Sequence, residues 1–185
     1  YQLTHDYLVP SLREWLTRKQ KETHRGRAEL QLAELSALWN AKPENRRLPS
    51  WNDYRVIRRF VPPKDWTNAQ KRMMRQAALH HARAVVRRLL EADLRDVPAV
   101  VRQVRQLRRN AVPLLRKEQR ASADPSPERL HTALALLEVD ESQCDYLYEQ
   151  LLNATALDFP VLRDALAAHR ERLSARLWND ATTGE

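Results

Sequence analysis

Three arginines are the residues of this sequence whose spacing points most directly to a binding chemistry. Arg102, Arg105 and Arg109 recur at helical intervals, so on the helix that Val97 begins they share an edge away from the valines. A row of guanidinium groups can hold phosphates, which makes this edge the candidate site for an anion or a partner. The alternative interpretation is a solvated face, paired with acidic residues of the chain, because no aromatic residues for base stacking are interleaved with the arginines.

The other reactive side chains do not form the constellation of an enzyme. His80 and His81 are neighbours inside a helix pattern and have no Cys, Asp or Glu at ligand spacing nearby, so we expect no metal site. His131 and His169 fall near helix ends, where we expect solvated or capping side chains. Cys144 stands at an apolar helical position and is predicted to be a small core residue. The sequence contains no G-x-x-x-x-G-K-[ST], G-x-S-x-G, H-E-x-x-H or C-x-x-C, and we predict no catalytic residues.

The composition restricts the class of protein further. The chain has 185 residues and only two glycines, which argues against a β protein with many tight turns and against a Gly-rich phosphate loop. A single cysteine excludes an internal disulfide, and no stretch has the length of a transmembrane span, so we expect a cytoplasmic protein without a membrane partner. Residues 1–120 hold 27 Lys and Arg against 12 Asp and Glu, net +15, whereas residues 121–185 hold 5 against 12, net −7.

Residues 1–41 are predicted to contain a strand-like start and one long helix. After a strand-like start at residues 1–4, an apolar helical face runs through Leu12 and Leu16, is absent between Thr17 and Glu29, and returns at Leu32. A helix of roughly 30 residues with apolar ends and a charged middle usually bridges two packed bodies across solvent. Gly26 is the expected point of a break.

The rest of the chain is predicted to be helical as well. Residues 42–66 form a connector whose short helix, 51–60, begins behind Ser50 as a cap. Residues 67–185 form an array of helices: one from Thr67 to about Glu91, one from Val97, a shorter one over 112–119, and others behind the cap Ser126. The predicted fold class is therefore all-α, a long bridging helix followed by an array of antiparallel helix pairs.

The array contains two related copies, at about 89–116 and 151–178. A shift of 62 positions carries Leu-Leu-x-Ala-x-x-x-Asp-Val-Pro onto Leu-Leu-x-Ala-x-x-x-Asp-Phe-Pro, and seven residues of the window are identical. In each copy an Asp, 96 or 158, is expected to cap a helix, and a Pro, 98 or 160, occupies its first turn. The period fits two helical hairpins per copy and predicts a HEAT-like array.

The stretch L-T-H-D-Y-L-V-P-S-L-R-E-W-L, residues 3–16, resembles the end of the winged helix of STAND-class NTPases. In that class a His-Asp pair closes the winged helix and the His reaches the β-phosphate of bound ADP, so the resemblance implies this phosphate-sensing role for His5. Residues 18–45, with R-G-R-A-E-L and L-W-N-A-K-P-E-N-R, and residues 136–152 resemble the segments that follow such modules in bacterial multidomain proteins of planctomycete type. The Walker motifs, and with them ADP or ATP, are expected upstream of Tyr1, and no cofactor is expected in this segment itself.

Together these observations predict a non-catalytic helical scaffold that couples a nucleotide-driven switch to a protein partner or to a neighbouring domain of the same chain. Stacked helix pairs suit this task because they present extended binding surfaces. The alternative is a basic helical module that binds nucleic acid through the edge formed by Arg102, Arg105 and Arg109.

Overall fold

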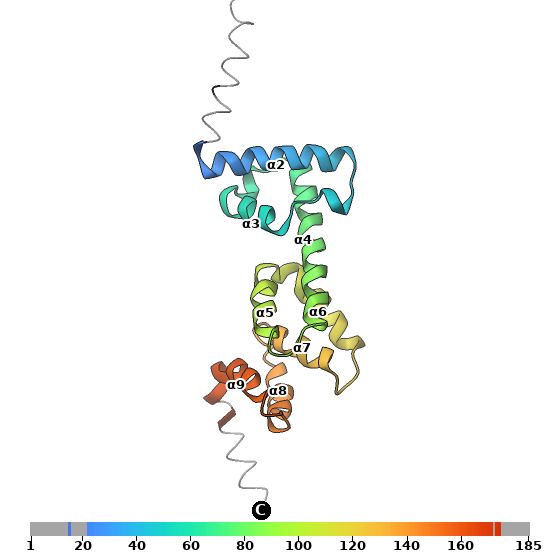
Figure 1. The fold of residues 1–185 in the computed structure, drawn as a ribbon, viewed down its shortest axis with the longest axis vertical. Coiled ribbons are helices and arrows are strands. Elements are labelled where there is room, and N and C mark those ends of the chain that lie inside the picture. Colours follow the sequence, from blue (N-terminus) through green and yellow to red (C-terminus); the bar gives the residue numbers. More distant parts are fainter. Residues whose placement is uncertain (1–14, 16–21, 172, 175–185) are drawn as a thin grey trace, which may run out of the picture. The chain divides into compact units, whose positions relative to one another are not determined.

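The computed structural model of the chain describes residue 15, residues 22–171 and residues 173–174. These residues form eight α-helices and three short 3-10 helices and include no β-strand, so the predicted all-α class is confirmed (Figure 1). Their contacts divide the chain into two compact units, Tyr1–His81 and Ala82–Glu185, which we describe one at a time. The division at residues 41 and 66 and the HEAT-like arrangement of the helix pairs stay predictions.

Unit 1 is built on two packed helices and the start of a third. It contains α2 (His24–Ala41), η1 (Asn45–Arg47), α3 (Trp51–Phe60), η2 (Pro63–Asp65) and the first part of α4 (Asn68–Leu90). Helix α2 packs against α3. Leu32, Ile57 and Met73, one from each helix, are at most 1% exposed and form the centre of this small core.

The long bridging helix predicted in residues 1–41 is interrupted. Helix α2 begins only at His24, because the Oγ1 of Thr23 accepts a hydrogen bond from the backbone N–H of Gly26 at 3.0 Å and caps a new helix there. Gly26 itself is buried inside α2 and does not break it, and α2 lies against α3 within unit 1 instead of crossing solvent. The expected winged-helix end falls outside the described residues, apart from Trp15.

Unit 2 is organised around one buried helix. It contains the end of α4, α5 (Val97–Gln106), α6 (Arg108–Ala121), α7 (Pro127–Leu136), α8 (Gln143–Leu152), α9 (Phe159–Leu166) and η3 (Ala167–His169). Helix α7 packs against α5, α6 and α8. All six of its residues from His131 to Leu136 are buried: four are apolar, and the two polar side chains, His131 and Thr132, are hydrogen-bonded to backbone oxygens.

Three helix starts follow the predicted caps. The Oγ atoms of Ser50 and Ser126 accept hydrogen bonds from the backbone N–H groups three residues later, at 3.2 and 3.1 Å. At the start of α4, Thr67 and Gln70 cap each other reciprocally: Thr67 Oγ1 accepts from the N–H of Gln70 at 3.3 Å, and Gln70 Oε1 accepts from the N–H of Thr67 at 2.9 Å. The short helix of the connector, α3, has the predicted bounds, 51–60.

The two sequence copies have the same local backbone structure. In both, a helix ends at a Leu-Leu pair, a turn of six residues follows, and the next helix begins at the seventh, Val97 or Phe159. Four backbone hydrogen bonds of the first copy recur 62 residues later. In the first copy they join Ala92 N to Leu89 O, Asp96 N to Asp93 O, Ala99 N to Asp96 O and Val100 N to Asp96 O. In the second copy, in the same order, they join Ala154 N to Leu151 O, Asp158 N to Thr155 O, Val161 N to Asp158 O and Leu162 N to Asp158 O.

One prediction about these copies is wrong in detail. Asp96 and Asp158 do occupy the N-cap positions of α5 and α9, but neither side chain makes a capping hydrogen bond. Both residues have helical backbone angles because the preceding turn already leads into the helix, so their side chains do not reach back to the first-turn N–H groups. Pro98 and Pro160 lie in the first turn as predicted.

Candidate interaction groove

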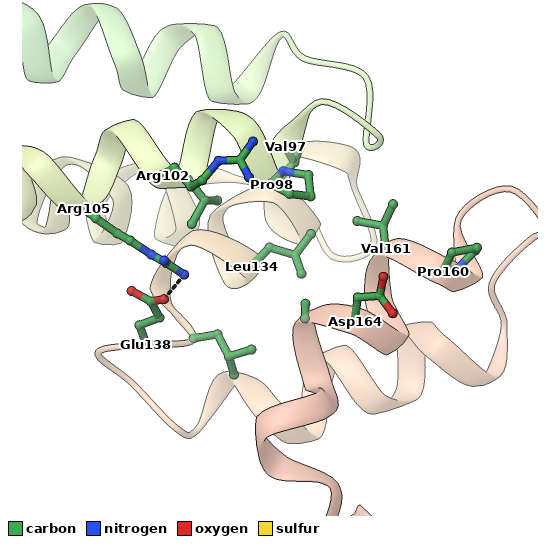
Figure 2. A pocket seen from close by; sticks show the side chains of 12 residues that line it. Val97, Pro98, Arg102, Arg105, Leu134, Glu138, Pro160, Val161 and Asp164 are labelled. Atoms are coloured by element: carbon green, nitrogen blue, oxygen red, sulfur yellow. Dashed lines mark ion pairs between the residues drawn. The ribbon is translucent and has the colours of Figure 1, made fainter.

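A groove of about 430 Å³ between α5 and α9 collects side chains from several helices of unit 2 (Figure 2). Its apolar surface comes from α5 and from α7 and the residue that ends it, with Val97, Val101, Leu134 and Leu137. The first-turn prolines of both copies, Pro98 and Pro160, also line it, together with Val161 of α9. The two copies of the repeat therefore present their helix starts to one common groove.

Charges of both signs surround this apolar surface. Arg105 of α5 forms an ion pair with Glu138, which follows α7, and Figure 2 shows this pair at one end of the groove. On α9, Asp164 is paired with its neighbour Arg163 at 2.7 Å. Both pairs are about half exposed, so each contributes at most about 1 kcal/mol to folding. Arg102 lines the groove and has no ion pair or hydrogen bond to any described residue, which leaves one unpaired cation beside the apolar surface.

The structure separates the three arginines that the sequence had grouped. Arg102 and Arg105 lie on α5, but this helix ends at Gln106 and Arg109 belongs to α6. The break occurs at Leu107, whose backbone leaves the helical conformation and whose side chain is 3% exposed. Burial of Leu107 thus turns the chain before the predicted edge is complete, and the three arginines do not form one ridge.

A different basic surface was missed. Helix α6 runs from Arg108 to Ala121 instead of over 112–119 as predicted. Its longer course places Arg109, Arg116, Lys117 and Arg120 on one exposed face with Pro113. We call these four cations the α6 basic face. Pro113, Arg116, Lys117 and Arg120 line a shallow hollow of about 520 Å³ that contains no acidic residue. The spacing was visible in the sequence, but it becomes a surface only if the helix extends back to Arg108.

Two of the histidines, His81 and His131, contact backbone oxygens inside the fold. His131, expected to be solvated or capping, is 3% exposed, and its Nδ1 lies 3.0 Å from the backbone oxygen of Leu89. Burial lowers the pKa of this imidazole, and burial also lowers the pKa of His81, whose Nε2 lies 3.0 Å from the backbone oxygen of Pro49. The rings of His80 and His81 are 5.7 Å apart. No group of three or more His, Cys, Asp or Glu residues in the described part of the chain is placed to hold a metal ion.

Two further predictions concern single residues. Cys144 is fully buried in unit 2, as expected for a small core residue. His5, the phosphate-sensing residue implied by the resemblance, lies outside the described residues. Within these residues, no helix combines the length and the apolar character that a membrane span requires.

Comparisons with known proteins identify no relative: no family model, no curated protein and no solved structure matches the chain.

Proposed function

We propose that this chain is a non-catalytic coupling segment of a multidomain signalling NTPase of the STAND class, in which a HEAT-like array holds a protein partner or a neighbouring domain. The observation that carries the protein-binding part is the groove between α5 and α9, because it joins an apolar surface to an unpaired cation, Arg102. The NTPase part rests on the resemblance of residues 3–16 to the end of a winged helix. In this proposal ADP or ATP binds upstream of the segment, in the cytoplasm.

The groove has the chemistry of a protein contact. Each square ångström of apolar surface that a partner covers contributes roughly 25 cal/mol, and the exposed Pro98 and Pro160 with the half-buried Val161 offer such a surface to an apolar side chain. Arg102 then selects a partner whose carboxylate reaches the rim, since burial of an unpaired guanidinium would be unfavourable. A partner segment with one or two apolar residues followed by an acidic one fits this arrangement.

A photo-crosslinking experiment tests the proposal. A photoreactive amino acid is placed at Val161, which lines the groove, and in a matched chain at Leu38, which is 51% exposed on α2. In the intact parent protein, we expect a crosslink from position 161 to one protein or domain, weakened by Arg102→Glu, and none from position 38. The yield is expected to change severalfold between the ADP-bound and ATP-bound parent. Equal products from both positions would contradict a specific contact, and a yield independent of nucleotide would contradict the coupling.

A second candidate function, nucleic-acid binding, is favoured by the α6 basic face and not by the predicted edge at Arg102. None of the four cations Arg109, Arg116, Lys117 and Arg120 forms an ion pair with a described residue. Only Arg116 lies near a carboxylate, that of Asp140, whose pKa is lowered by hydrogen bonds from Ser142 and less by this cation, so the face can take phosphates. Binding of a generic DNA duplex through four phosphate contacts would weaken roughly 100-fold between 50 and 200 mM salt. Arg116→Glu with Arg120→Glu should abolish such binding, whereas Arg102→Glu should not. Absence of binding at 50 mM salt would eliminate this function.

A further inference from the structure

In unit 1, the start of α2 and the end of α3 bring two flat rings together. The imidazole of His24 and the ring of Phe60 have centroids 5.5 Å apart and planes only 14° apart, so the two rings stack. Arg27 donates from its Nη2 to the Nδ1 of His24 at 3.0 Å, which fixes the orientation of the imidazole. Phe60 is half-buried and His24 is exposed. Because Phe60 covers one face of the imidazole, the other face is open to a further flat ring.

Cations accompany these rings. The guanidinium carbon of Arg59 lies 5.7 Å from the centroid of the Phe60 ring, and that of Arg58 lies 5.9 Å from the centroid of the Trp66 ring. Arg58 and Arg59 form no ion pair or hydrogen bond with any described residue, and Arg27 forms no ion pair with one. We call His24, Arg27, Arg58, Arg59 and Phe60 the His24 surface.

Contacts between α2, α3 and η2 hold this surface in place. Arg25 of α2 forms ion pairs with Glu29 at 2.7 Å and with Asp65 of η2 at 3.1 Å. Trp66, which follows η2, is 8% exposed, and its Nε1 donates to the backbone oxygen of Val61 at 3.1 Å. The two carboxylates are thus bound by Arg25, and they do not pair with the cations of the His24 surface.

Helix stability explains only part of this arrangement. Arg58 and Arg59 stand in the last turn of α3, where the helix dipole favours cations. That effect requires neither an exposed imidazole stacked on Phe60 nor a third cation, Arg27, from another helix. Cations that alternate with aromatic rings are typical of surfaces that bind single strands, where phosphates meet the cations and bases stack on the rings. The arginines of α5 have no such rings among them.

We propose that the His24 surface binds single-stranded nucleic acid. One base stacks on the open face of His24, and Arg27, Arg58 and Arg59 hold the phosphates of neighbouring nucleotides. A duplex fits poorly because its bases are already stacked on each other, and an acidic peptide supplies negative charge without a row of flat rings. This activity goes beyond the protein-binding groove, and its site differs from the α6 basic face in residues and in ligand.

Fluorescence anisotropy of the full chain with a labelled strand of twelve thymidines tests the proposal. We expect saturable binding at 50 mM salt that weakens roughly 20-fold at 200 mM, as for three phosphate contacts on a single strand. His24→Ala should weaken binding roughly 5- to 150-fold, the effect of losing one stacking ring, whereas His24→Tyr, which keeps a ring, should bind like the parent. A strand of the same length without bases should bind the parent as weakly as the thymidine strand binds His24→Ala.

The cations are tested with a matched pair of variants. Arg58→Gln with Arg59→Gln should weaken binding at least tenfold. Arg72→Gln with Arg75→Gln removes two other exposed cations of unit 1, on α4, and should change binding by less than twofold. Circular dichroism checks that each variant is folded. His24→Gln, which can still accept the hydrogen bond from Arg27, replaces His24→Ala if that variant unfolds.

Several results would overturn the proposal. Absence of binding at 50 mM salt, or equal binding of the strand without bases, would remove the stacking site. Tighter binding of a labelled polyglutamate peptide of the same length would assign the surface to an acidic protein. Loss of strand binding in Arg116→Glu with Arg120→Glu, with none in His24→Ala, would assign the strand to the α6 basic face instead.

Discussion

Arg102 and Asp164 stand at equivalent positions of the two repeat copies, 62 residues apart, and both line the same groove with opposite charges. The prolines Pro98 and Pro160, which are also equivalent, line it as well. The groove is therefore formed by the same position of both copies, and divergence between the copies has given its two sides different charges (Figure 2). A groove with a cation on one side and a carboxylate on the other orients an asymmetric partner, because reversal of the partner would place like charges together.

Loss of an apolar side chain should destabilise unit 2 only where that side chain is buried. Leu136 of α7 is fully buried, and Leu136→Ala should reduce the free energy of unfolding by about 2–5 kcal/mol, the usual cost of a lost core side chain and its cavity. Leu152→Ala, at the end of α8 where the residue is 61% exposed, should change it by less than about 0.5 kcal/mol. Urea unfolding followed by far-UV circular dichroism measures both. A loss of more than 1 kcal/mol for Leu152→Ala would mean that this residue is covered in the folded chain.

Loss of the N-cap side chain should lower the free energy of unfolding at Ser126 but much less at Asp96. Ser126→Ala removes a side-chain acceptor from the first turn of α7 and should cost about 0.5–2 kcal/mol. Asp96→Ala, at the N-cap position of α5, should cost much less, since the Asp96 side chain makes no capping bond. Thermal unfolding of the two variants beside the parent chain makes the comparison. An equal loss for both would restore the capping role that the sequence predicts for Asp96.

The buried pair Gln119 and Gln143 provides a double-mutant test. The Nε2 of Gln119 donates to the Oε1 of Gln143 at 2.5 Å, and both side chains are 8% exposed. Gln119→Leu leaves the amide of Gln143 without this partner and should cost about 1–3 kcal/mol. Adding Gln143→Leu should recover part of that loss, because the second polar group is removed as well. Strictly additive losses in urea unfolding would show that the hydrogen bond does not couple the two residues.

Acidification should destabilise the chain through its buried histidines. Burial lowers the pKa of His131 and of His81 in the folded state below the ordinary value of 6.5, so the unfolded chain binds more protons. The stability from these neutral imidazoles is complete above pH 6.5 and is lost as the pH falls through the folded pKa values. Near His131, Glu128 and Asp93 oppose this shift, but burial outweighs them.

The measurement is the urea midpoint between pH 7.5 and 5. We expect it to fall for the parent chain, and to fall less for His131→Asn and for His81→Asn. His169→Asn, at a partly exposed position of η3, is the control and should behave like the parent. An identical fall in all four proteins would assign the pH dependence to other groups.

Local sequence signals predicted the local structure well. Ser50 and Ser126 were identifiable as caps because a cap and the N–H group that it accepts from lie three residues apart. The repeat was identifiable because its turn is also local: hydrogen bonds between residues a few positions apart hold it, so the same residues recur in both copies. The Thr23 cap that divides the predicted long helix was missed, because no Pro or Gly outside the helix marks the boundary.

The candidate sites depended on packing that the sequence does not display. The break at Leu107 has no proline or glycine either; it reflects the burial of one leucine, and it moves Arg109 to another helix. The pairing of Arg105 with Glu138 depends on the packing of α5 against α7, and it gives Arg105 the acidic partner that the sequence had left open as the alternative to a binding edge. The burial of His131 has the same origin, since its partner Leu89 lies 42 residues away in sequence.

The burial of the second half of α7, residues 131–136, bears on how unit 2 comes apart. Linear arrays commonly lose their terminal repeats first, because each repeat touches only its neighbours. Because α7 contacts α5, α6 and α8 and its residues 131–136 are all buried, it cannot be released without exposing the interior on several sides at once. Its amide protons should accordingly exchange with solvent only during global opening, and the unit should melt in a single cooperative step instead of unravelling from one end.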